Sequence, residues 1–406
     1  MNRSGHADLP LHYGQVPPWL AQRMSKLGGA IIEAILVDYG KSEVLKRMSD
    51  PMWFQALGCV LGMDWHSSGI TTSVMGALKK AINPNSKELG IYICGGKGKY
   101  SRETPNELLK IADRTGLNGL ELVRASKLST KIDNTAIQDG FQLYLHSFIV
   151  SDEGEWAVVQ QGMNDASGMA RRYHWHSGQL KSFINEPHTF IYGHNQGMIL
   201  NLVNKEAGST QNGILQISKE VPDKMMTEVR KIILPRHHDV RKEDVNIKRL
   251  GAVLALAHER SVVNFEELLL LEGLGPRTLQ SLTLVSEVIH GTPSRLEDPA
   301  RFSFAHGGKD GHPFPVPIKV YDETISVLKQ AVEKAKIGFT EKQAAIKSLH
   351  KIAENMEKDF VPNNNFNELI VKERNESYKY GGRTVTGFAK PLKNNAGRQL
   401  DLFNLN

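Results

Sequence analysis

The sequence predicts an α+β fold, with an N-terminal mixed α/β domain followed by an all-α domain and a flexible tail. Two strand-like stretches, FQLYLHSFIV (141–150) and WAVVQQGM (156–163), flank the turn SDEGE, which predicts a hairpin of two strands. Apolar residues recur at helical spacing over 245–291 and again over 321–358. We therefore expect the strands to lie within residues 1–205.

The predicted elements of the first domain follow one another along the chain. Two helices over 17–62 are separated by the Asp50-Pro51 break, and further helices and strands alternate after them. The later elements are a helix from Thr72 to about Ile82, a strand at 89–94, a helix opened by a Thr104–Glu107 capping box, and strands within 188–194 and 198–204.

The predicted domain boundaries rest on changes in composition. A chain of 406 residues exceeds one small core, so several domains are expected. After the α+β domain at 1–205, the segments are a polar connection at 206–245, the all-α domain at 246–320, a helical pair at 321–360, and a disordered basic tail at 361–406.

Composition limits the class of protein. Hydrophobic residues make up 40% and charged residues 23%, which is typical of a globular protein. No apolar run reaches the 18 or more residues of a membrane span, and the N-terminal residues lack the apolar core of a signal peptide. The two cysteines, Cys59 and Cys94, lie in apolar stretches, which favours buried thiols in a reducing compartment. We expect a cytoplasmic protein, whose net charge of +6 permits nucleic-acid binding.

A glycine-rich turn within 265–290 is the clearest functional signal. It has the Gly-apolar-Gly pattern of helix-hairpin-helix proteins, followed by a proline that can start the second helix. Glycines allow the backbone to approach a phosphate closely, and the helix amides then point at the anion. The residues predicted to bind DNA here are Gly273, Gly275, Arg277 and Thr278. The structural alternative is an ordinary turn between two packed helices.

A short peptide near the C-terminus resembles the motif by which bacterial replication and repair proteins bind the sliding clamp. Its predicted contacts are Gln399 as a polar contact, with Leu400, Leu402 and Phe403 filling an apolar pocket. A flexible tail suits such a peptide, because it orders on binding. The alternative is an apolar chain end with no partner.

Polar clusters in the first domain suggest a divalent metal, Mg²⁺ or Mn²⁺. Asp and His at short spacing are the ligands that metal-assisted phosphodiester cleavage needs. The predicted metal ligands are Asp8, His12, Asp64, His66 and Asp133, and the predicted catalytic residues are Asp64, His66, Asp133 and His146. Lys97, Lys99, Arg171 and Arg172 are predicted to contact DNA phosphates. Purely structural histidines, and a glycine turn after a strand, remain the alternatives.

Several longer stretches resemble the domain-of-unknown-function 763 family. They include GHADLPLHYGQVPPWLAQRM, ALGCVLGMDWHSSGITT, GGKGKYSRETP, ARRYHWHS and RFSFAHGGKDGHPFPV. The likeness runs from about residue 5 to about residue 320, so the helical pair and the tail fall outside it. It implies an N-terminal domain joined to a helix-hairpin-helix domain, with a nuclease-like role, and transfers no catalytic residues.

Three functions from different classes remain open. The first is a metal-dependent nuclease acting on DNA in repair or replication and recruited to the sliding clamp. The second is a non-catalytic repair adaptor that binds DNA structures. The third is a glycosylase-like base-excision enzyme, for which Asp298 or Asp310 could be the catalytic aspartate. DNA and the sliding clamp are the expected partners, and a homo-oligomer is left open.

Overall fold

The computed structural model describes most of the chain. The described residues are 9, 16–63, 68–193, 195–233, 247–300, 318–335, 338–357, 383–384 and 387–388.

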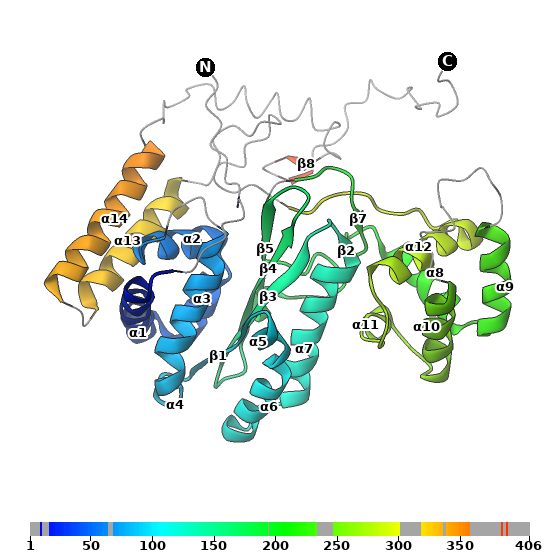
Figure 1. The fold of residues 1–406 in the computed structure, drawn as a ribbon, viewed down its shortest axis with the longest axis horizontal. Coiled ribbons are helices and arrows are strands. Elements are labelled where there is room, and N and C mark those ends of the chain that lie inside the picture. The colour runs from blue at the N-terminus through cyan, green and yellow to red at the C-terminus, as the bar shows by residue number, and fades with distance from the viewer. Residues whose placement is uncertain are drawn as a thin grey trace, which may run out of the picture.

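A five-stranded antiparallel sheet in the order β1-β3-β4-β5-β6 occupies the centre of the molecule (Figure 1). Its strands are β1 (Ile91–Lys97), β3 (Gln142–Ser151), β4 (Trp156–Asn164), β5 (Met169–His176) and β6 (Phe190–Tyr192). The predicted hairpin is confirmed as β3 and β4, and the strand at 89–94 as β1. The pair β2 (Ile137–Gln138) and β7 (Leu200–Asn201), and the pair β8 (Arg383–Thr384) and β9 (Gly387–Phe388), lie outside it.

Helices cover both faces of the sheet, and the mixed α+β class is confirmed. One face packs against α1 (Pro18–Met48), α2 (Pro51–Val60) and α3 (Gly69–Ile82). The opposite face packs against α6 (Thr104–Thr115) and α7 (Gly119–Lys131). Alternate residues of β1 enter the two cores, because side chains of a strand point to opposite faces in turn. Ile91 and Ile93 join the first core, and Tyr92 and Cys94 join the second.

Short elements connect the larger ones. They are η1 (Asn83–Asn85), α4 (Ser86–Leu89), α5 (Lys99–Arg102), the π-helix η2 (Ile132–Ala136) and η3 (Ser177–Gln179). The π-helix continues α7 directly and carries Asp133.

A group of described helices lies at one end of the molecule, to one side of the sheet (Figure 1). They are α8 (Gly208–Lys219), α9 (Pro222–Ile233), α10 (Ile247–Glu259), α11 (Phe265–Leu269) and α12 (Pro276–His290). The prediction of a connection at 206–245 therefore misses two helices. The apolar residues of this segment are sparse, but Ile214 and Ile217 of α8 are fully buried in the same core as α12.

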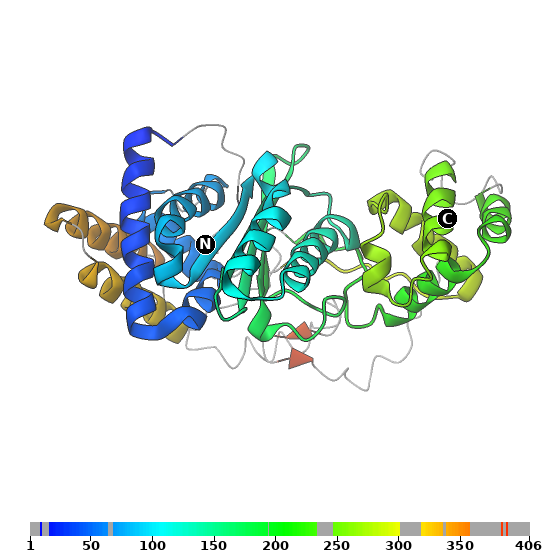
Figure 2. The same cartoon turned by 90° about the horizontal axis from the view of Figure 1, so that it is seen from below.

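The predicted helical pair is confirmed as α13 (Ile318–Lys334) and α14 (Phe339–Glu357). Both views place it beside α1, at the far end from α8–α12 (Figures 1 and 2). Leu328, Val332 and Leu349 belong to the core that α1, α2 and α3 form on the sheet. The chain thus returns to its N-terminal helices after completing α12.

Two predicted helix starts differ from the structure. Helix α3 begins at Gly69, and Thr72 donates its hydroxyl to the Gly69 carbonyl within the first turn. The Thr104–Glu107 capping box is not formed, because Glu107 accepts hydrogen bonds from the Gly95 amide at 2.6 Å and from Lys79 Nζ at 2.7 Å. A long-range ion pair has replaced the local contact.

Within the described residues, none of the helices combines the length and the apolar character needed to cross a membrane.

Candidate nucleic-acid interface

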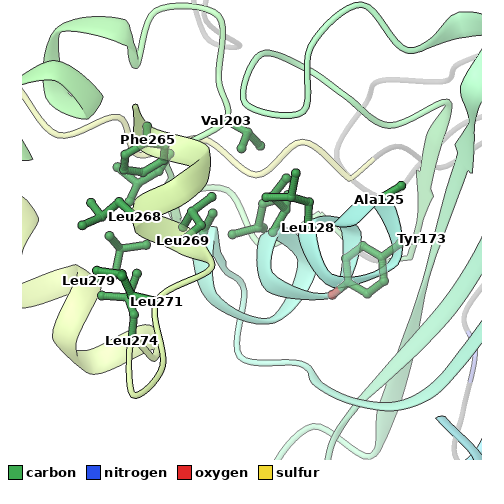
Figure 3. Close-up of a cluster of buried hydrophobic side chains, with 14 of the residues drawn as sticks. Ala125, Leu128, Tyr173, Val203, Phe265, Leu268, Leu269, Leu271, Leu274 and Leu279 are labelled. Carbon is green, nitrogen blue, oxygen red and sulfur yellow. The ribbon is translucent and has the colours of Figure 1, made fainter. Parts of the chain in front are cut away.

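Helix α11 and the turn after it are fixed by apolar packing. The Asn264 side chain caps α11 by accepting a hydrogen bond from the Glu267 amide at 2.9 Å. Leu271 and Leu274 of the turn are buried, and they lie beside Leu279 of α12 in Figure 3. The same core continues to α7, so the turn rests on the sheet-bearing part of the molecule.

The two glycines of the turn have different roles. Gly273 has a φ of +80°, in the left-handed region that favours glycine. Gly275 is the N-cap of α12, with φ −128° and ψ 179°, a backbone conformation open to any residue. A Cβ on Gly275 would meet no atom within 4 Å. Gly273 is therefore required by the turn itself, whereas the turn does not require glycine at position 275.

Side chains from other elements bind two carbonyl oxygens of the turn and the carbonyl oxygen of Pro276, the first residue of α12. Arg249 Nε donates to the Gly273 carbonyl at 3.0 Å, and Lys131 Nζ donates to the Leu274 carbonyl at 2.6 Å. Gln138 Nε2 donates to the Pro276 carbonyl at 2.8 Å. These contacts occupy oxygens that would repel a phosphate.

The start of α12 is suited to an anion. Its N-cap, Gly275, has no side chain, and Pro276 at the first position has no amide hydrogen. The amides of Arg277 and Thr278 thus have no side-chain cap, and they carry the positive end of the helix dipole. The Arg277 side chain is exposed and that of Thr278 is buried; Glu272 is an exposed acidic residue of the turn.

Asp133 lies in the core and not at the surface. Its carboxylate accepts hydrogen bonds from Trp175 Nε1 at 3.0 Å and Gln160 Nε2 at 2.5 Å, and contacts His188 Nε2 at 2.5 Å. It is fully buried, and burial raises the pKa of this carboxyl group. Every oxygen that a metal would need already has a protein partner.

His146 belongs to the same buried network. Its Nδ1 lies 2.9 Å from Gln160 Oε1, and its Nε2 lies 2.8 Å from Ser126 Oγ. Burial lowers its pKa to about 4, which keeps the ring neutral near pH 7. Gln160 joins His146 to Asp133, so the structure brings these two predicted site residues together, and all three side chains are buried. No group of three or more His, Cys, Asp and Glu side chains suited to a metal occurs among the described residues.

Arg171 is buried between two carboxylates. Its Nη1 lies 2.8 Å from Asp139 Oδ2, and its Nη2 lies 2.7 Å from Asp298 Oδ2. The side chain is fully buried, so it cannot contact a DNA phosphate in this conformation. Asp298 is equally engaged, which argues against its use as a glycosylase acid.

Arg172 points to the other face of β5. Its guanidinium lies between the rings of Phe54 and Tyr192, 4.6 and 5.0 Å from their centroids, and donates to His174 Nε2 and to Gln55 Oε1. Burial lowers its pKa to about 10. It too is fully buried and out of reach of DNA in this conformation.

Lys97, the last residue of β1, and Lys99, the first residue of α5, are exposed, as a DNA contact requires. Gly95 before them is a packing requirement, since a Cβ there would lie 2.2 Å from the His146 carbonyl oxygen. Contact of the two lysines with DNA stays a prediction, whereas Gly95 has a structural role.

The remaining predicted residues lie outside the described part of the chain. They are Asp8, His12, Asp64, His66, Asp310, Gln399, Leu400, Leu402 and Phe403. Two described residues near the first four are hydrogen-bonded to the sheet: the Leu9 carbonyl accepts from the Ala170 amide at 2.8 Å, and the Ser68 carbonyl accepts from Gln161 Nε2 at 2.9 Å. Ala170 and Gln161 lie on the paired strands β5 and β4, at the same end of the sheet.

Sequence reasoning missed Lys131, Gln138 and Arg249 at the turn. Lys131 precedes the predicted metal ligand Asp133, but its contact with Leu274 spans 143 positions. No local spacing marks such a pair.

Comparisons with known proteins give one match. A family model described as a protein of unknown function (DUF763) matches residues 5–316. No curated protein and no solved structure matches the chain.

Proposed function

The chain belongs to the DUF763 family, and we propose that it binds the phosphate backbone of DNA through a helix-hairpin-helix formed by α11, the turn at 270–275 and α12. One observation carries the proposal: the carbonyl oxygens of Gly273, Leu274 and Pro276 accept hydrogen bonds from other elements of the protein, while the uncapped amides of α12 stand beside the exposed Arg277. Backbone amides and an arginine together are suited to a phosphate. Contacts of this kind are independent of base sequence.

Gly275→Ala tests this proposal. The added methyl group would enter open space in the free protein, so the fold should be unchanged. The same methyl group would obstruct a phosphate that approaches the α12 amides, and duplex affinity should fall on all sequences alike, by about tenfold or more. Gly76→Ala is the matched control, because its Cβ also meets open space, on α3. Equal affinity of Gly275→Ala and Gly76→Ala, measured by fluorescence anisotropy, would remove the turn from the DNA-binding surface.

We also propose metal-dependent phosphodiester cleavage, with Asp8, His12, Asp64 and His66 as candidate ligands of Mg²⁺ or Mn²⁺. The support is that Leu9 and Ser68, described neighbours of these residues, attach to the same end of β4 and β5. Leu9 and Ser68 are thus attached to neighbouring strands of the sheet. Asp133 and His146 are left out of this set, because both are buried in a satisfied network.

The cleavage test uses end-labelled single-stranded, duplex, flap and junction DNA with Mn²⁺, Mg²⁺ or EDTA. Cutting that requires metal and disappears in Asp64→Ala would support both the activity and the site. Cutting that survives Asp64→Ala would move the site elsewhere. Binding without cutting under any metal would favour the non-catalytic adaptor. Asp133→Asn is the control for damage to the fold, to be checked by thermal unfolding.

The C-terminal peptide is proposed to recruit the protein to the sliding clamp. Deleting residues 399–406 should abolish binding to the clamp and leave DNA affinity unchanged. Unchanged clamp affinity after the deletion would refute this role.

A further inference from the structure

Basic side chains from three elements meet at the turn. Lys131 is the last residue of α7, Arg249 lies in the first turn of α10, and Arg277 lies in the first turn of α12. Lys131 and Arg249 donate to the neighbouring carbonyl groups of Leu274 and Gly273. We name Lys131, Arg249 and Arg277 the turn cations.

Two of the turn cations repel each other. The pKa of Lys131 is lowered by burial and by the positive charge of Arg249. Holding a half-buried ammonium beside a guanidinium costs free energy, which an anion bound between them would offset. The Leu274 carbonyl takes one of the three N–H donors of the Lys131 ammonium, and the others can reach a ligand.

The positive charge continues along α7. Lys127 lies four residues before Lys131, on the same face of the helix, and is exposed. Arg124, one turn earlier on this side, forms an ion pair with Glu266 of α11 at 2.6 Å. Helix α7 belongs to the sheet-bearing part of the chain, so this positive surface runs from that part to the turn.

We propose that Lys131 and Arg249 bind one backbone phosphate of DNA, and that the α12 amides and Arg277 bind the adjacent phosphate. Helix α7 and the turn would then contact the same DNA strand. This inference rests on the proposed function, since it extends the same surface. It assigns a phosphate contact to a residue of the N-terminal part that carries the sheet. The DNA strand bound at the turn would then have a fixed position relative to the β-strands β4 and β5.

The experiment measures binding of the full chain to a labelled duplex over 0.05–0.3 M salt. One phosphate contact contributes about 0.9 to the slope of log affinity against log salt, which is roughly eightfold in affinity at 0.1 M salt. We expect Lys131→Gln to lose about this much slope and affinity. Lys131→Arg, which keeps the charge, should retain most of both. Lys329→Gln is the control, because Lys329 is exposed on α13 at the other end of the molecule.

The outcomes separate the inference from the function on which it rests. A slope lost in Lys131→Gln and restored in Lys131→Arg, with similar melting temperatures, supports the second phosphate contact. An unchanged slope in Lys131→Gln, while Gly275→Ala abolishes binding, overturns the contact and leaves the proposed function standing. No binding by the wild-type chain overturns both.

Discussion

Basic side chains occur in two contrasting settings in this protein. Arg171 and Arg172 of β5 are fully buried, whereas Arg249 and Arg277 are exposed beside the turn. The sequence does not distinguish the two settings. Arg171 and Arg172 are predicted to contact phosphates just as Arg277 is, and Arg249 is not singled out. The difference teaches that positive charge marks a nucleic-acid surface only where the fold leaves it accessible.

The two buried arginines also differ from each other in their partners. Arg171 lies between the carboxylates of Asp139 and Asp298, while Arg172, on the opposite face, lies between two aromatic rings and donates to neutral acceptors. Strand geometry alone separates them, because consecutive residues point to opposite faces.

The largest expected effect is on stability, from Arg171→Met. Removal of the guanidinium leaves the Asp139 and Asp298 carboxylates buried without their cation, which should cost about 3–5 kcal/mol. Urea unfolding measures this free energy. Arg277→Met, at an exposed position, should change it by less than about 0.5 kcal/mol. Similar losses in the two variants would break the distinction between the buried and the exposed setting.

A buried base of a different kind, His146, should make stability depend on pH. Its pKa of about 4 in the folded chain lies below the ordinary 6.5, so between these values the unfolded chain binds a proton that the folded chain does not. This histidine adds no pH dependence above pH 6.5, and its contribution is lost as the pH falls toward 4.

This difference between the folded and unfolded pKa of His146 lowers the free energy of unfolding by about 3 kcal/mol from pH 7 to pH 4. From pH 7 to pH 4, the free energy of unfolding of His146→Gln should therefore fall by about 3 kcal/mol less than that of the wild type, as measured by urea unfolding at both pH values. His290→Gln, at an exposed position on α12, should keep the wild-type dependence. Parallel curves for His146→Gln and the wild type would contradict the neutral buried ring.

The two glycines of the turn sharpen the comparison. Gly273→Ala forces an L-residue into the left-handed region and should cost about 1–2 kcal/mol. Gly275→Ala should change stability by less than about 0.5 kcal/mol, since its backbone is extended and its Cβ is unobstructed. Thermal unfolding of the two variants tests the order, and Gly273→Asn should lie between them, because asparagine tolerates this conformation.

The smallest expected effect is on affinity, from Glu272→Gln. Glu272 is an exposed carboxylate in the turn and should repel the DNA backbone. An exposed charge contributes less than about 1 kcal/mol, so removing it should tighten duplex binding by about twofold at low salt. Titrations at low and high salt provide the check, because the gain should shrink as salt screens the charge. A weaker complex would place the phosphate on another side of the turn.

Much of the local structure was determined by the sequence alone. The turn between β3 and β4, the proline break between α1 and α2, the glycine turn before Pro276 and the break before α14 each act over a few residues. Such signals come from backbone sterics and side-chain period, which need no distant partner.

Only the tertiary structure decided which of the candidate residues are accessible. Asp133, Arg171 and Arg172 are charged residues, which the sequence alone would place at the surface. Each is buried in the structure, where distant side chains satisfy its charge or its hydrogen bonds. The same holds for Lys131, whose place at the turn depends on a carbonyl 143 positions away. Burial and long-range pairing arise only in the folded core. The sequence around a charged residue does not show which distant side chains will desolvate it and satisfy its hydrogen bonds.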